Sequence, residues 1–251
     1  MKSEWGFDPE YRTKIVSLYY ALRQGEGITQ AQLDDLVNEW EARIKPNAKE
    51  RGESFALCLP SGQTTGVLGP RWVCHVFGLR HRATEIALKT EQGLILLQRR
   101  SPTVQDWANA PDMAVAGHIP QKPDGSDLSF LEGAWKEMAE EIGLLETNAD
   151  EDLVEGELAP VGVPYVSLDL AIERSPPFFN CEVRQIFAAT ITGKGLSRLR
   201  FADNEVSGML LVTPETAWSL LEKGDIASGM RYSLPRYLDW LAQNEARSPL
   251  V

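Results

Sequence analysis

The stretch of residues 117–144 constrains the fold and the chemistry of this chain more than any other segment. Within it, Glu137, Glu140 and Glu141 follow one another at α-helical spacings. A helix of about 3.6 residues per turn places such spacings on one stripe, and the apolar residues between them fall on the opposite face. Gly143 comes next and predicts a left-handed C-cap. The sequence therefore predicts an amphipathic helix that presents three carboxylates together.

Three adjacent carboxylates predict a metal site, although a second interpretation fits the same residues. Carboxylates repel one another unless a cation lies between them, and ligation by oxygen alone suits Mg²⁺ or Mn²⁺. Glutamate is also a good helix former, and acidic helix faces commonly meet only solvent. The glutamates by themselves leave both interpretations open.

The residues around the glutamates favour the metal site. Ala116-Gly117-His118-Ile119 precedes them, and they lie in the run Lys136-Glu-Met-Ala-Glu-Glu-Ile-Gly-Leu144. This arrangement resembles the Nudix box, G-x5-E-x7-R-E-U-x-E-E-x-G-U with U apolar, whose C-terminal half differs only in having arginine where Lys136 stands. The resemblance implies a fold of the α/β class, an α/β/α sandwich with a mixed sheet. It also implies a metal-dependent Nudix hydrolase that cleaves a diphosphate linkage in a small phosphorylated metabolite, such as a nucleoside diphosphate derivative, by attack of water on phosphorus.

Two departures from the box affect the expected site. Between Gly117 and Lys136 lie 18 residues, five more than the pattern has. The first glutamate of the box therefore has no secure counterpart, since strict spacing gives Pro123. The nearest acidic residues are Asp124, Asp127 and Glu132. Lys136 keeps the positive charge of the family arginine but lacks its bidentate fork, which weakens the expected contact with a neighbouring glutamate.

Three further motifs extend the resemblance over roughly residues 79–215. They are His81-Arg82-Ala83, Leu96-Leu-Gln-Arg-Arg100 and Trp107-Ala-Asn-Ala-Pro-Asp-Met-Ala-Val-Ala-Gly-His118. Together they resemble the branch of the Nudix superfamily that contains isopentenyl diphosphate isomerase. That branch has two chemistries, hydrolysis and isomerisation, and the residues favour the first.

The isomerase uses a cysteine in a Cys-Gly-His segment, a glutamate in an Asn-Glu-Val-type strand and a histidine-rich metal site. Here Ala116 stands in place of the cysteine, and alanine cannot exchange a proton with carbon. Glu182 matches the glutamate, and His81 and His118 match metal ligands, although isolated histidines are more often structural. An isomerase-like enzyme is therefore the disfavoured alternative, and a non-catalytic Nudix module that senses a phosphorylated metabolite is the other.

The hydrolase interpretation implies roles for residues inside and outside the box. The expected metal ligands for Mg²⁺ or Mn²⁺ are Glu137, Glu140 and Glu141. The expected catalytic carboxylates are Glu137, Glu140 and Glu182, with Glu205 as an alternative to Glu182. The expected substrate-binding residues are Arg82, Arg99, Arg100, Trp107 and Lys136. Arginines clamp phosphates, and the tryptophan could stack on a flat ring of the substrate.

The acidic composition limits the possible partners. A net charge of −11 argues against duplex nucleic acid as a partner, because phosphate binding needs a basic face. The cysteines number three and include no C-x-x-C pair, which indicates reduced thiols that are packed rather than reactive. The sequence shows neither an apolar N-terminal signal region nor an apolar run of membrane length. We therefore expect a cytoplasmic protein with no membrane partner.

The order of patterns along the chain predicts three regions. Residues 1–50 are expected to form an N-terminal helical region, whose hairpin over residues 8–45 could pack on the main domain or on a second subunit in a homodimer. Residues 51–78 are expected to contribute short strands and a connector. Residues 79–251 are expected to form the Nudix hydrolase domain with C-terminal helices. Its predicted elements are strands at 83–90, 94–100, 158–166, 180–191 and 206–212, and helices at 214–224 and 233–244.

Overall fold

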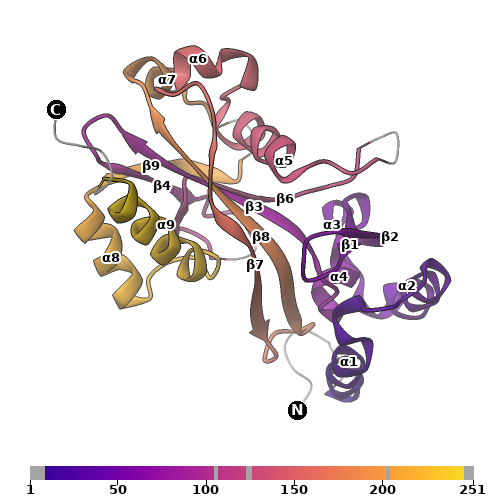
Figure 1. The fold of residues 1–251 in the computed structure, drawn as a ribbon. Coiled ribbons are helices and arrows are strands. Elements are labelled where there is room, and N and C mark those ends of the chain that lie inside the picture. The colour runs from indigo at the N-terminus through magenta and orange to yellow at the C-terminus, as the bar shows by residue number, and fades with distance from the viewer. Residues whose placement is uncertain (1–8, 105–106, 123–125, 202–203, 246–251) are drawn as a thin grey trace. The chain divides into compact units, whose positions relative to one another are not determined.

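The computed structural model describes residues 9–104, 107–122, 126–201 and 204–245 (Figure 1). The chain forms two compact units, each assembled from three segments. Unit 1 comprises Met1–Ala83, His118–Leu128 and Pro164–Arg184, and unit 2 comprises Thr84–Gly117, Ser129–Val163 and Gln185–Val251. The boundaries expected after residues 50 and 78 stay a prediction.

The helices of unit 1 come from the N-terminal part of the chain. They are α1 (Pro9–Leu22), the 3₁₀ turn η1 (Arg23–Gly25), α2 (Gln30–Ile44), α3 (Ala48–Gly52) and α4 (Arg71–Phe77). A capping box between Thr29 and Gln32 begins α2, because each residue satisfies a backbone N–H that the first helical turn leaves without a partner. Lys45 adopts a left-handed conformation and ends the helix. The predicted N-terminal helices are thus confirmed.

The core of unit 1 is rich in aromatic side chains. The short strands predicted in residues 51–78 are β1 (Ser54–Cys58) and β2 (Thr64–Pro70), which pair antiparallel. The rings of Tyr19 and Phe179 stack with centroids 4.3 Å apart. Gly78 allows this approach, because its φ is +65° and a Cβ there would overlap the ring of Tyr19. The buried aromatic residues of this core are Tyr19, Trp40, Phe55, Trp72, Phe77 and Phe179.

The remaining described strands all contribute residues to unit 2. They are β3 (His81–Thr90), β4 (Ile95–Arg100), β5 (Pro111–Met113), β6 (Val115–His118), β7 (Ala159–Ala171), β8 (Phe178–Ile191) and β9 (Val206–Val212). Of these, β3, β6, β7 and β8 give residues to both units. The strands predicted at 83–90 and 94–100 are confirmed, and they form a hairpin in which Leu88 on β3 pairs with Leu96 on β4 in antiparallel register. β4 also pairs with β5 and β9 and is therefore an interior strand.

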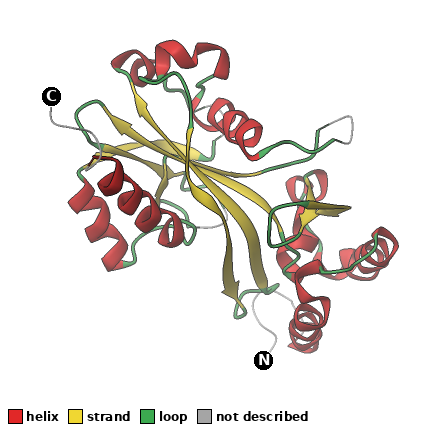
Figure 2. Ribbon diagram, viewed as in Figure 1, coloured by secondary structure: helices red, strands yellow, loops and turns green. Residues whose placement is uncertain are grey.

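Helices cover both faces of the strands in unit 2. They are α5 (Phe130–Glu137), η2 (Met138–Ile142), η3 (Glu146–Asn148), α6 (Ala149–Asp152), α7 (Gly193–Arg198), α8 (Pro214–Lys223) and α9 (Met230–Glu245). Figures 1 and 2 show α5 on one side of these strands and α8 with α9 on the other. The predicted helix after β9 begins with Pro214 and ends at Gly224, which is left-handed. This arrangement confirms the α/β class.

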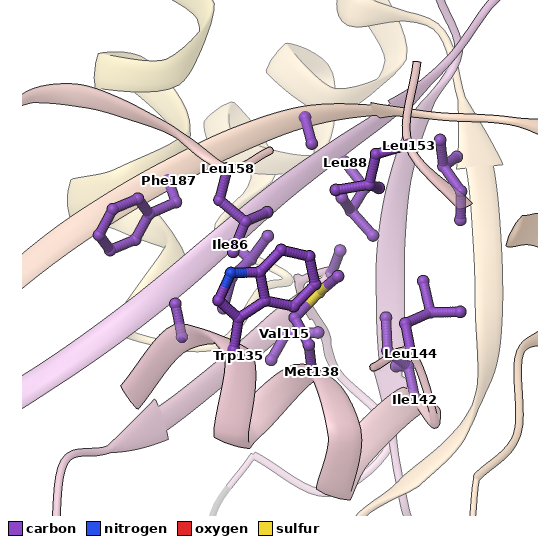
Figure 3. Packing of buried hydrophobic residues seen from close by; sticks show 14 of the residues in the cluster. Ile86, Leu88, Val115, Trp135, Met138, Ile142, Leu144, Leu153, Leu158 and Phe187 are labelled. Carbon is purple, nitrogen blue, oxygen red and sulfur yellow. The ribbon is translucent and has the colours of Figure 1, made fainter. Parts of the chain in front are cut away.

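The apolar side of α5, together with η2, which continues the same helix, builds the core of unit 2. In Figure 3, Trp135 and Met138 point from the helix toward β3, where Ile86 and Leu88 lie. All four side chains are at most 8% exposed. Burying a side chain of this size stabilises the folded state by about 1.5–3 kcal/mol. This packing determines where the polar side of the same helix lies.

Two local predictions need correction. The strand predicted at 180–191 is longer than expected, because β8 already begins at Phe178. Arg71–Phe77 was not assigned to a helix, yet it forms α4. Its aromatic and β-branched residues favour strands locally, and burial of every residue after Arg71 outweighs that preference. Within the part of the chain that the structure describes, no helix has the length and apolar character needed to cross a membrane.

The three cysteines are free and buried in unit 1. Burial raises the pKa of Cys58 to about 12 and that of Cys181 to about 11, and it raises the pKa of Cys74 further. Because the thiolate is the reactive form, we expect the native protein to react very slowly with a disulfide reagent at mildly alkaline pH. All three thiols should react at once after unfolding in guanidinium. Fast labelling of a native thiol would contradict this prediction.

Candidate functional site

Glu132, one of the candidates for the first glutamate of the box, lies at the start of α5 and caps that helix. The Ser129 side chain accepts a hydrogen bond from the Glu132 backbone N–H at 3.1 Å, and Glu132 accepts from the Ser129 backbone N–H at 2.7 Å. Glu132 is thus part of a capping box. In unit 1, Asp127 accepts a hydrogen bond from Thr64 and lies 3.9 Å from Arg82. Pro123 and Asp124 lie outside the described residues.

The helix changes geometry where the glutamates occur. After Glu137 it continues as a π-helix over Met138–Ile142, so the regular α-helical spacing assumed for the whole stripe does not hold. Gly143 closes the turn in the predicted left-handed conformation, with φ of 75°. Glu137 and Glu141 are buried, whereas Glu140 is exposed. Single π-turns inside helices occur frequently at functional sites.

Glu141 is a buried carboxylate among other carboxylates. Its Oε2 accepts hydrogen bonds from Gln98 Nε2 and from the backbone N–H of Ala116, both at 3.2 Å. Burial raises the pKa of Glu141 well above its ordinary value, and the charge of Glu137 raises it further. Glu205 and Asp112 act in the same direction. A nearby positive charge would stabilise the ionised form of this carboxyl group.

Glu137 lies directly against the backbone at Gly117. A Cβ added to Gly117 would overlap the Glu137 carboxylate, so the glycine of the box is needed for this approach. Lys136 Nζ lies 3.2 Å from Glu137 Oε1 and 2.6 Å from Glu140 Oε2. Lys136 therefore bridges two of the three predicted metal ligands.

The predicted substrate-binding residues fall in both units. Arg99 ends β4 and is exposed, and Arg100 Nη1 lies 3.3 Å from Asp112 Oδ2. Trp107 is 42% exposed with φ of 55°, and the Arg231 guanidinium lies 5.4 Å from its ring centroid. These residues belong to unit 2, as do the box glutamates. Arg82 is buried in unit 1, where Asp127 faces it.

Glu182, the predicted catalytic residue outside the box, lies in unit 1 beside histidines. Ligand atoms of His75, His81, His118 and Glu182 all lie within 4.8 Å of one another. The chain has three histidines in total, and all of them belong to this group. We call these four residues the histidine cluster. Three imidazoles and one carboxylate form a donor set that suits transition metals.

Hydrogen bonds prepare the histidine cluster for a cation. His81 Nδ1 lies 2.9 Å from the Leu79 carbonyl oxygen, so this nitrogen donates and Nε2 keeps its lone pair. In the described part of the chain, the buried Nε2 atoms of His75 and His81 have no hydrogen-bond partner. His118 Nε2 lies 3.0 Å from Glu182 Oε1, while Arg184 binds Glu182 Oε2.

The electrostatics of the cluster favour neutral imidazoles at His75 and His118 and an ionised carboxylate at Glu182. Burial lowers the pKa of His118 to about 4 and lowers that of His75 well below its ordinary value. Burial opposes ionisation of Glu182, but Arg184 and His118 outweigh it and hold the pKa of this carboxyl well below its usual range. Neutral imidazole is the form that binds metals.

One aromatic side chain orders the cluster. The Phe55 ring stacks on His81 and on His118, with centroids 4.7 and 4.6 Å away. His75 was not among the residues predicted from the sequence to form the site, so its position in the cluster was missed. The only available signal was compositional, since a chain with so few histidines places two of them six residues apart.

No family model matches the chain. It is 32% identical over 179 residues to Nudix hydrolase 3 of Arabidopsis thaliana, an alignment that covers 70% of this chain and 21% of that protein. It is 29% identical over 137 residues to the uncharacterized Nudix hydrolase YfcD of Shigella flexneri, with 55% and 61% of the two chains covered. The chain belongs to the Nudix superfamily.

This Nudix protein spans less than two thirds of the length of both relatives. The crystal structure of DR0079 from Deinococcus radiodurans has the same fold. It aligns with a TM-score of 0.50 and 19% identity, over 74% of this chain and 99% of that one. The comparison supports the predicted α/β sandwich.

The contact between Gly117 and Glu137 gives a stability prediction for the Nudix protein. Replacing Gly117 by Ala should lower the free energy of unfolding by about 1–3 kcal/mol, because the new methyl group overlaps the Glu137 carboxylate. Gly193→Ala is the control, since a Cβ there meets nothing within 4 Å. Urea denaturation measures both. Equal stability of the two variants would show that Glu137 does not need this approach.

Proposed function

We propose that this Nudix protein is a metal-dependent hydrolase that cleaves a diphosphate linkage in a small phosphorylated metabolite by attack of water on phosphorus. The observation that carries the proposal is the burial of Glu141 among the charges of Glu137, Glu205 and Asp112. Buried like charges are costly unless a cation offsets them. A nucleoside diphosphate derivative is the substrate class that the box resemblance favours.

The donor set fits Mg²⁺ or Mn²⁺, because it offers carboxylate oxygens alone. Glu137, Glu140 and Glu141 would hold the ion. When bound, it would offset charge on the diphosphate and acidify a water molecule. Glu140 is the exposed member and is paired with Lys136, which also contacts Glu137, so Lys136 offsets part of the charge of these two carboxylates.

Residues of unit 2 provide the rest of the proposed chemistry. Arg99 is exposed at the end of β4 and would clamp a terminal phosphate. Arg100 already faces Asp112, so it supports the site more than it contacts substrate. The partly exposed ring of Trp107 would stack on a flat ring. Glu205 acts electrostatically on Glu141 and is favoured over Glu182 as the general base.

The test is separation and identification of the hydrolysis products formed with Mg²⁺ and then Mn²⁺ from a panel of nucleotide sugars, dinucleotide cofactors, nucleoside triphosphates and prenyl diphosphates. Glu137→Gln and Glu140→Gln should each lower kcat by about 100-fold or more, because each removes a carboxylate from the proposed site. Glu146→Gln, a change at an exposed glutamate, should leave the rate unchanged.

Two outcomes would contradict the hydrolase proposal. Turnover that survives in both glutamate variants would show that the box does not carry the reaction. Lack of turnover on the whole panel, with a panel member still raising the melting temperature, would favour the non-catalytic sensor. Cytoplasmic location and a homodimer formed through the N-terminal helices stay predictions.

A second candidate function is favoured by the histidine cluster. The isomerase-like branch of the superfamily has a histidine-rich metal site, and His75, His81, His118 and Glu182 supply such a group. Ala116 still stands where the proton-transferring cysteine is expected. Isomer analysis of the prenyl diphosphates in the same panel distinguishes the two functions, because an isomerase adds and removes a proton at carbon, moves the double bond and leaves the diphosphate intact.

The histidine cluster itself gives a metal prediction that does not depend on turnover. We expect stoichiometric binding of Co²⁺ with visible ligand-field bands, because neutral imidazoles suit this ion. His75→Phe should abolish the bands, since His75 Nε2 is one of the two nitrogens without a partner in the described residues. Glu141→Gln should retain them. Bands that persist in the His75 variant would exclude the cluster as the binding site.

A further inference from the structure

The hydrogen bonds to Glu141 are directed at only one of its oxygens. Gln98 Nε2 and the Ala116 backbone N–H both bond Oε2. A carboxylate offers about four lone-pair positions over its two oxygens. Two donors on Oε2 therefore orient the group and leave Oε1 as the oxygen available for a cation.

We propose that Gln98 is a positioning residue, which holds Oε2 of Glu141 so that Oε1 is presented as a metal ligand. The inference rests on the proposed function, because it concerns the same cation site. Gln98 contributes no charge, whereas Lys136 approaches Glu137 and Glu140 as a cation. A neutral amide orients the carboxylate without competing with the metal charge.

The surroundings of Gln98 make it a rigid donor. It is 1% exposed, and its strand β4 is paired on both sides. Its partners in register are Asp112 on β5 and Met209 on β9. The backbone ladder thus fixes the Cα position, and burial fixes the side chain. A donor built on a strand holds a ligand more exactly than one on a loop.

The two donors differ in how mutation can change them. The Ala116 donor is a backbone N–H in β6 and persists whatever side chain stands there. The Gln98 donor is a side chain, so a single substitution removes it. Among the described hydrogen bonds, it supplies the side-chain donor to Glu141, and its replacement isolates the positioning effect.

The chain offers a matched control in a second buried glutamine of unit 2. Gln185 is 5% exposed on β8, and its Nε2 donates to the Ile186 carbonyl oxygen at 2.7 Å. Replacing it by methionine removes a buried amide of the same size. That amide serves a backbone carbonyl, whereas the amide of Gln98 serves a carboxylate.

The experiment compares Mn²⁺ affinity by electron paramagnetic resonance in wild type, Gln98→Met, Gln185→Met and Glu141→Gln. The part of the binding lost in Glu141→Gln defines the carboxylate site. Gln98→Met should weaken that binding by roughly 10- to 100-fold, the usual effect of losing a partner behind a metal ligand. Gln185→Met should keep wild-type affinity. Melting temperatures of all variants separate loss of affinity from loss of fold.

The outcomes distinguish failure of this inference from failure of the proposed function. Wild-type affinity in folded Gln98→Met, with binding still dependent on Glu141, would overturn the positioning role alone. Mn²⁺ binding that does not depend on Glu141 would overturn the proposed site and this inference with it. If Gln98→Met does not fold, Gln98→Asn serves instead, because its amide is one methylene too short to reach Oε2. Unchanged affinity there would also overturn the positioning role.

Discussion

The packing of Trp135 and Met138 into the core of unit 2 is the interaction on which the carboxylate site depends. These side chains fix the rotation of α5 and so bring Glu137 against Gly117 and Glu141 beside Gln98. Burying carboxylates near one another is unfavourable. Burial of each large apolar side chain on the same helix, at about 1.5–3 kcal/mol, offsets that cost. The apolar face of this helix thus fixes the position of the site, although the carboxylates on its other face repel one another.

Local sequence patterns predicted much of the fold because they carry their own physical signal. The capping box at Thr29, the hairpin pairing Leu88 with Leu96 and the Pro214 start of α8 all follow from neighbouring residues. Helix α4 did not follow, because its residues favour a strand and only burial makes it helical. The assembly of each unit from three distant segments depends on tertiary contacts, which periodicity does not encode.

In the candidate sites, too, some features follow from local sequence patterns and others depend on tertiary contacts. The box glutamates could be located from their spacing and their resemblance to a known motif. Their unequal burial could not, because it arises from the π-turn at Met138–Ile142. The role of Gln98 depends on strand pairing, and the position of His75 depends on α4 meeting residues more than forty positions away. Contacts between residues far apart in the chain cannot be predicted from a local sequence pattern.

The gathering of every histidine into one cluster has a consequence for how the protein exchanges protons. Histidine is the side chain whose ordinary pKa lies between about pH 5 and 8, and the surface described here carries none outside the cluster. The charge of −11 therefore stays nearly constant over the range in which cells work. Burial keeps His75 and His118 neutral over that range, whereas it raises the pKa of the Glu141 carboxyl toward that range. A calorimetric count of the protons released when a cation binds therefore reports on the buried Glu141 carboxyl and has no contribution from a surface histidine.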